Sequence, residues 1–140
     1  MSQERLDLSA FTKAIESLNV ALQAYENEQG NEFIRDASIQ RFEYSYELAT
    51  KMLKRYLSLT LANPSELTEM TFQNLIRTAY GKGLIPNSWD QWSLFRHARN
   101  ITSHTYSEEK AIEVLEVLPL FYKEVAFLLD SLERANETQF

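Results

Sequence analysis

Apolar residues recur at every third or fourth position along most of this chain, which is the period of an amphipathic helix. The chain has only three glycines and three prolines in 140 residues, too few for the frequent turns of a sheet protein. Hydrophobic residues make up 44% of the sequence, which is enough to bury a core. Because no change in composition marks a boundary, we predict a single domain over residues 1–140.

The pattern predicts an all-α fold of four to five helices. Asn87 or Ser88 is the expected cap of the helix that carries the two tryptophans, and Ser107 is the expected cap of the last helix. The last helix is expected to kink at Pro119, since proline removes a backbone donor and crowds the preceding turn. Long helices with short connections pack most simply as an antiparallel four-helix bundle. The first three helices are expected over Ser9–Asn27, Glu32–Leu61 and about Thr68–Tyr80.

The charge of the chain argues against general binding of nucleic acid, because a formal net charge of −6 repels phosphate at long range. The charge is uneven, however. The segment from Thr71 to His104 carries four basic residues and one acid. This segment is either a local anion site on an acidic body or the uneven charge of ordinary helix faces.

The sequence also bears on location. It contains no cysteine, so disulfides and thiolate metal sites are excluded. No apolar run approaches the roughly 20 residues needed to span a bilayer, and the start of the chain lacks the profile of a secretory signal. We therefore expect a cytoplasmic protein with no membrane association.

The segment from Arg99 to Tyr106 carries the strongest functional signal. Arginine can neutralise a phosphate, and histidine exchanges protons near neutral pH. If the tryptophan helix continues through this segment, Arg96, Asn100 and His104 are successive i,i+4 neighbours on one stripe. The alternative is structural: His104 caps a helix, Arg99 forms an ion pair and Tyr106 packs in the core.

Other polar residues have simpler explanations at this stage. Glu43 and Glu47 are by default a solvated acidic face, and Glu47 is expected to pair with Lys51 one helical turn later. His97 and His104 lie seven residues apart without acids at ligand spacing, so we predict no metal site and no cofactor.

Two stretches of the sequence resemble a known family. Arg99-x4-His104-x-Tyr106, with Asn100 directly after the arginine, resembles the signature of the HEPN superfamily of small helical bundles. The stretch Arg41–Lys51 resembles one branch, the nucleotidyltransferase substrate-binding proteins, although Thr50 stands where this branch is expected to have a tryptophan. Gly83, Leu84, Ile85 and Trp89 extend the resemblance, which thus covers roughly residues 41–106.

The resemblance implies a bundle that forms a homodimer and binds a separately encoded minimal nucleotidyltransferase, in a pair of the toxin–antitoxin type. It also implies that Glu43 and Glu47 face the cleft that holds the Arg-x4-His motif. Related branches act as ribonuclease toxins, and in some of them the transferase adds AMP to the motif tyrosine, which is Tyr106 in this sequence.

Two functional hypotheses follow. In the first, the chain is a binding subunit whose Arg96, Arg99 and His104, with the two acids, hold a phosphate or nucleotide for the partner transferase. In the second, it is a metal-independent endoribonuclease in which Arg99 stabilises charge, Asn100 orients, His104 moves protons and Tyr106 completes the catalytic motif. A twofold dimer would supply the second proton-transfer group.

Overall fold

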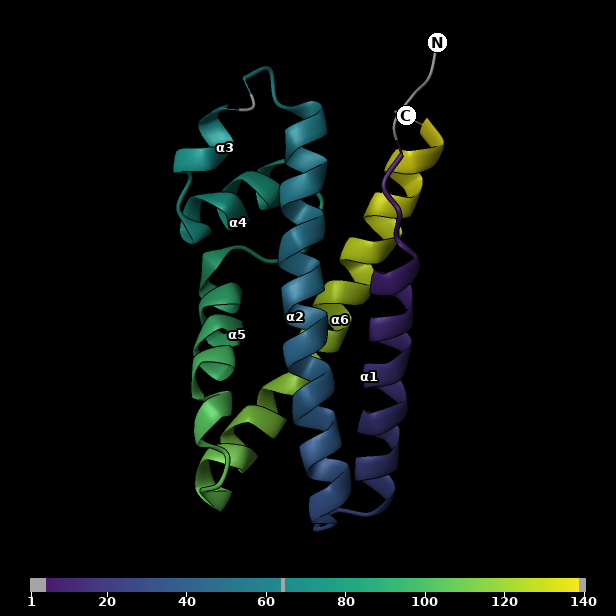
Figure 1. Cartoon of the computed structure of the whole chain (residues 1–140), viewed down its shortest axis with the longest axis vertical. Helices are drawn as coiled ribbons and strands as arrows, with labels where there is room; N and C mark the ends of the chain where they lie inside the picture. The colour runs from purple at the N-terminus through teal and green to yellow at the C-terminus, as the bar shows by residue number, and fades with distance from the viewer. Residues whose placement is uncertain (1–4, 64, 139–140) are drawn as a thin grey trace.

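The computed structural model describes residues 5–63 and 65–138, and these residues form helices and connections without a strand. Four long helices make the bundle, and two short helices lie at its upper end (Figure 1). Residues 1–4, used above for the signal argument, lie outside the described residues, as do Pro64 and residues 139–140. The elements are α1 (Ser9–Asn27), α2 (Glu32–Thr60), α3 (Ser65–Glu69), α4 (Phe72–Gly81), α5 (Trp89–Ile101), the 3₁₀ turn η1 (Thr102–His104) and α6 (Glu108–Thr138).

Helices α1 and α2 run antiparallel and side by side (Figure 1). Gly30 adopts a positive φ of 96° in the tight connection, and the Asn31 side chain accepts hydrogen bonds from two backbone amides in the first turn of α2. Ser45 and Ala49 are small and fully buried, and the Ser45 hydroxyl lies 3.3 Å from the backbone oxygen of Ala14 on α1. These small residues on α2 are consistent with a close approach of α1.

The helix predicted over about Thr68–Tyr80 is wrong in its boundaries, because two helices occupy this region. Thr71 interrupts the pattern with an extended backbone (φ −70°, ψ 160°), and its hydroxyl accepts a hydrogen bond from the Asn74 amide. This threonine is therefore an N-cap and not a helix interior residue. Gly83, just beyond the end of α4, has the positive φ (77°) that ends such a helix.

Helix α6 continues unbroken through Pro119 and bends along its length (Figure 1). Its apolar face covers the other three long helices, with Phe121 at the centre of an aromatic cluster. Within the described residues, no helix has both the length and the apolar character required to cross a bilayer. The rings of the cluster are Phe42, Tyr46, Phe72, Trp92, Phe95 and Phe121.

The buried carboxylate of Glu124 on α6 fixes the start of α5. It accepts hydrogen bonds from the Trp92 indole (3.0 Å) and from the Asn87 backbone amide (3.1 Å). The Asn87 side-chain amide donates a third bond at 2.8 Å. Ser88 occupies the N-cap position of α5 without a side-chain cap bond, so the expected cap at Asn87 or Ser88 is replaced by this contact with α6.

Burial raises the pKa of Glu124 above its usual value of 4.5, although its three hydrogen bonds oppose this shift. The folded state then binds this proton more tightly than the unfolded state. The stability that Glu124 contributes is therefore present below pH 4.5 and is lost as the pH rises through the raised folded pKa. Relative to a Glu124→Gln variant, the wild-type free energy of unfolding should decrease as the pH rises from 4.5 to the raised folded pKa and should then level off.

Urea unfolding of both proteins between pH 4 and pH 8 measures this difference. Glu116→Gln, an exposed site on the same helix, is the matched control and should show no such trend. A difference between wild type and Glu124→Gln that is constant with pH would contradict the assignment.

Candidate functional site

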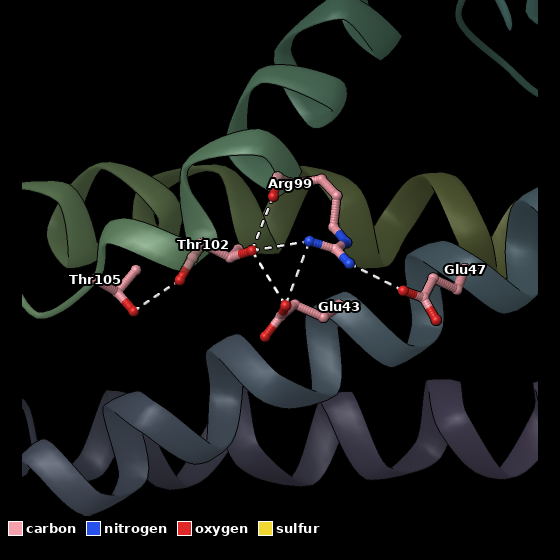
Figure 2. A network of polar contacts seen from close by, with 5 residues as sticks. All are labelled: Glu43, Glu47, Arg99, Thr102 and Thr105. Atoms are coloured by element: carbon pink, nitrogen blue, oxygen red, sulfur yellow. Dashed lines mark hydrogen bonds and ion pairs between the residues drawn. The ribbon is translucent and has the colours of Figure 1, made fainter.

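The guanidinium of Arg99, in the last turn of α5, is held by two carboxylates of α2. Its Nη1 lies 3.3 Å from Glu43 Oε2, and its Nη2 donates to Glu47 Oε1 at 2.9 Å (Figure 2). The Arg99 side chain is 31% exposed, so the pair is neither sealed nor fully solvated. Glu43 and Glu47 can share one arginine because residues four apart lie on the same helix face.

Thr102 completes this network from the end of α5. Its hydroxyl accepts a hydrogen bond from Arg99 Nη1 at 3.1 Å (Figure 2). The same hydroxyl lies 2.8 Å from the Arg99 backbone oxygen and 3.2 Å from Glu43 Oε2, and its single proton can serve only one of these acceptors at a time. Thr102 therefore ties the arginine backbone, its guanidinium and the α2 carboxylate into one unit.

The motif does not continue as an α-helix, so the condition for a stripe of Arg96, Asn100 and His104 is not met. α5 ends at Ile101, and residues 102–104 form a 3₁₀ turn, whose tighter winding breaks the i,i+4 register. The Thr102 hydroxyl bonds back to the Arg99 carbonyl, and the Thr105 hydroxyl bonds to the Thr102 carbonyl (Figure 2). The Arg99 carbonyl also accepts the Thr102 backbone N–H, so the Thr102 hydroxyl adds a second bond at the end of α5.

His104 is the last residue of this turn and Tyr106 follows it, and both side chains are exposed. Tyr106 is 89% exposed, so the alternative that places it in the core is wrong. Its ring meets the His104 ring edge-on, with 6.2 Å between ring centroids. Among the described residues, the His104 imidazole has no hydrogen-bond partner, and it therefore does not act as a side-chain cap.

Arg99 and Asn100 line an open hollow of about 490 Å³ between α5 and α2. From α2 the hollow is lined by Tyr46, Glu47 and Thr50. Thr50 is small compared with the tryptophan expected at this position, which leaves space beside Arg99. Arg96 lies one turn earlier on α5, exposed, with its guanidinium 5.4 Å from the centre of the Phe72 ring.

Tyr46 is a site residue that sequence reasoning missed. Aromatic residues in such a helix are expected in the core or an interface, and the Tyr46 ring does pack in the aromatic cluster. Burial raises its pKa to about 12, against the opposing charges of Arg96 and Arg99, so the phenol stays neutral at physiological pH. A neutral phenol can donate a hydrogen bond to an anion in the hollow. The signal available in the sequence was its position one residue before Glu47.

Glu43 and Glu47 both contact Arg99, but the predicted ion pair between Glu47 and Lys51 does not form in the described residues. Glu47 turns to Arg99, and no Glu47–Lys51 ion pair occurs within 4 Å in the described part of the chain. His97 forms an exposed contact with Glu113 on α6 at 2.8 Å and takes no part in the site. Residues 5–63 and 65–138 contain no group of three or more potential metal ligands among histidine, cysteine and the acids.

The guanidinium of Arg99 is already paired with side chains of the same chain. With both glutamates ionised, the group of Arg99, Glu43 and Glu47 has a net charge of −1. A phosphate that takes the donors now facing the two glutamates would displace at least one carboxylate. Such an exchange is feasible because a partly exposed ion pair is worth only about 1 kcal/mol.

Known proteins resemble the whole chain. A family model described as "Nucleotidyltransferase substrate binding protein like" matches residues 6–134. A curated relative from Haemophilus influenzae (strain ATCC 51907 / DSM 11121 / KW20 / Rd), "Probable ribonuclease HepT", is 40% identical over 100 residues, which is 71% of this chain and 68% of the relative.

A solved structure is also similar to this chain. HI0074 from Haemophilus influenzae is described as having the fold of a substrate binding domain of a nucleotidyltransferase. It matches with a TM-score of 0.85 and 32% identity, over 91% of this chain and 99% of its own. The chain therefore belongs to the nucleotidyltransferase substrate-binding protein-like family.

Proposed function

We propose that this chain is the helical, nucleotide-binding subunit of a separately encoded minimal nucleotidyltransferase, in a pair of the toxin–antitoxin type. The family description and the fold shared with HI0074 support a role beside such a transferase. The observation that carries the proposal is the partly exposed Arg99, held at the edge of a hollow that Asn100 and Tyr46 also line.

In this proposal the hollow holds a phosphate of the nucleotide. Arg99 exchanges a carboxylate for the phosphate, and the neutral Tyr46 phenol and the Asn100 amide donate further hydrogen bonds. Arg96 and His104 lie on either side along the chain and add positive charge when the histidine is protonated. The transferase supplies the chemistry, and its basic surface is attracted to a chain of net charge −6. A cytoplasmic homodimer remains part of this proposal.

Substitution of Arg99 and substitution of Glu47 should change the affinity for a nucleotide in opposite directions. Arg99→Ala should weaken the binding of AMP about tenfold or more, because a charge-assisted hydrogen bond contributes about 1.5–3 kcal/mol. Glu47→Gln should strengthen it severalfold, because Glu47 bonds only to Arg99 and competes with the phosphate. Isothermal titration calorimetry, with and without the transferase, measures both.

Arg77→Ala is the control, since it removes an exposed cation from α4, away from the hollow. Loss of binding in this control, or no AMP binding in either setting, would count against the proposal. Weaker binding by Glu47→Gln would show that the acid is a ligand and not a competitor.

A second candidate function is a metal-independent endoribonuclease, and the exposed His104 beside Tyr106 favours it. The name of the Haemophilus influenzae relative also points to this activity. The RNA 2′-oxygen would attack the adjacent phosphorus, giving a 2′,3′-cyclic phosphate and a free 5′-hydroxyl. One imidazole takes the 2′ proton, another protonates the leaving 5′-oxygen, and Arg99 stabilises the phosphoryl charge. Because each chain offers one motif histidine, a twofold dimer would supply the second.

The same geometry suggests how a transferase could silence the nuclease. Tyr106 is almost fully exposed, and its ring touches the edge of the His104 ring. AMP attached to the Tyr106 hydroxyl would bring a bulky anion beside the imidazole and exclude RNA from it.

Cleavage of single-stranded RNA in the presence of EDTA tests the nuclease directly. His104→Ala should lower the rate by about 10²–10⁴-fold, the usual contribution of a general acid–base group. His97→Ala, which removes the other histidine of the chain, should leave the rate unchanged. Full activity of His104→Ala would end this candidate function, and RNA that stays intact with wild type would do the same.

A further inference from the structure

Three shallow hollows follow one another along the exposed face of α2. The first is the Arg99 hollow, and a second of about 370 Å³ shares Glu47 and Thr50 with it. A third, of about 330 Å³, shares Arg55 and Ser58 with the second. From Glu47 to Ser58 the path covers eleven residues of helix, or about 16 Å. The depression is therefore long and narrow, a shape suited to an extended ligand.

Cations without partners line this path. Lys51, Lys54 and Arg55 border the second hollow, and all three side chains are exposed. Within the described residues none of them forms an ion pair. The contact between Glu47 and Arg99 contributes to this, because it removes the acid that would otherwise neutralise Lys51.

One acid on the far side, Asp7, acts electrostatically on Arg55 but forms no ion pair with it. Asp7, near the start of α1, accepts hydrogen bonds from the Ser9 amide and hydroxyl at 3.0 and 2.6 Å. It lies beyond 4 Å from the Arg55 guanidinium, since no ion pair joins them in the described residues. The row therefore presents three positive charges on a chain whose net charge is −6.

An exposed aromatic ring extends the row toward the start of α2. Tyr44 is 55% exposed. It lies seven residues before Lys51 and eleven before Arg55, which is close to two and three helical turns, so the three side chains share one face. Phe33, 87% exposed, lies a further three turns back on that face. Cations in line with exposed rings are the elements that bind single-stranded nucleic acid without reading its sequence.

We propose that the exposed face of α2, from Tyr44 to Ser58, binds a single-stranded RNA that continues into the Arg99 hollow. Lys51, Lys54 and Arg55 neutralise successive phosphates, and Tyr44 stacks on a base. This inference rests on the endoribonuclease candidate and gives that activity a surface that holds the strand beside Arg99.

The experiment measures the binding of a twelve-nucleotide single-stranded RNA in which every 2′-oxygen is methylated, so that binding is separated from cleavage. Fluorescence anisotropy at several salt concentrations gives the affinity and its salt dependence. In a triple variant, Lys51→Gln, Lys54→Gln and Arg55→Gln, the slope of log K against log salt should become shallower by about 2, which is about 0.7 for each lost phosphate contact. Tyr44→Ala should weaken binding about tenfold without changing the slope.

The matched control replaces three exposed lysines elsewhere, Lys13, Lys110 and Lys123, with glutamine. It changes the net charge by the same amount and should preserve the slope. Circular dichroism and light scattering confirm that all variants fold and keep one oligomeric state.

Equal slopes for the two triple variants would overturn the proposal. It would also be overturned if the α2 variant bound RNA normally but lost the transferase or changed its oligomeric state, since the face would then bind a protein. Failure of the endoribonuclease candidate can be distinguished from failure of this proposal. If ordinary RNA is not cleaved but the α2 substitutions still make the salt slope shallower, the α2 face binds RNA and only the catalytic role is wrong.

Discussion

The contact of Arg99 with Glu43 and Glu47 joins the end of α5 to the middle of α2, and the geometry of the candidate site depends on it. Thr102 adds its hydroxyl to the same contact, so the turn that follows α5 is fixed together with the guanidinium. Arg99 is therefore held in position by groups that already use its donors. Its partners are carboxylates, which carry negative charge as a phosphate does. Glu43 and Glu47 therefore compete with an incoming phosphate for the guanidinium.

The fold supports this site from the opposite end of α5. Trp92 is fully buried in the aromatic cluster, and its indole nitrogen bonds to Glu124 of α6. A helix held at its start by a buried carboxylate and at its end by an ion pair has little freedom to rotate. Glu47 on α2 affects two surfaces, because it restrains Arg99 and leaves Lys51 unpaired on the outer face of α2.

Long periodic segments could be predicted closely from the sequence, whereas ends and partners could not. The bounds of α1 and α2 follow from strong periodicity and from the cap at Asn31. The break at Thr71 was missed because threonine also occurs inside helices, and only its extended backbone distinguishes a cap. Partner choice is a tertiary property: spacing alone pairs Glu47 with Lys51, but the helix that packs alongside brings Arg99 closer. The hydroxyl of Tyr46 was overlooked for the same reason, since its exposure depends on the gap between α2 and α5.

The central claim is that the site works by exchange of Arg99 between carboxylate and phosphate. A crystal structure of the protein soaked with AMP tests it most directly. The account predicts that a phosphate oxygen replaces at least Glu47 on the guanidinium, with Thr102 still in contact with Arg99. AMP bound elsewhere, or bound in the hollow while both carboxylates keep their present contacts with Arg99, would contradict it.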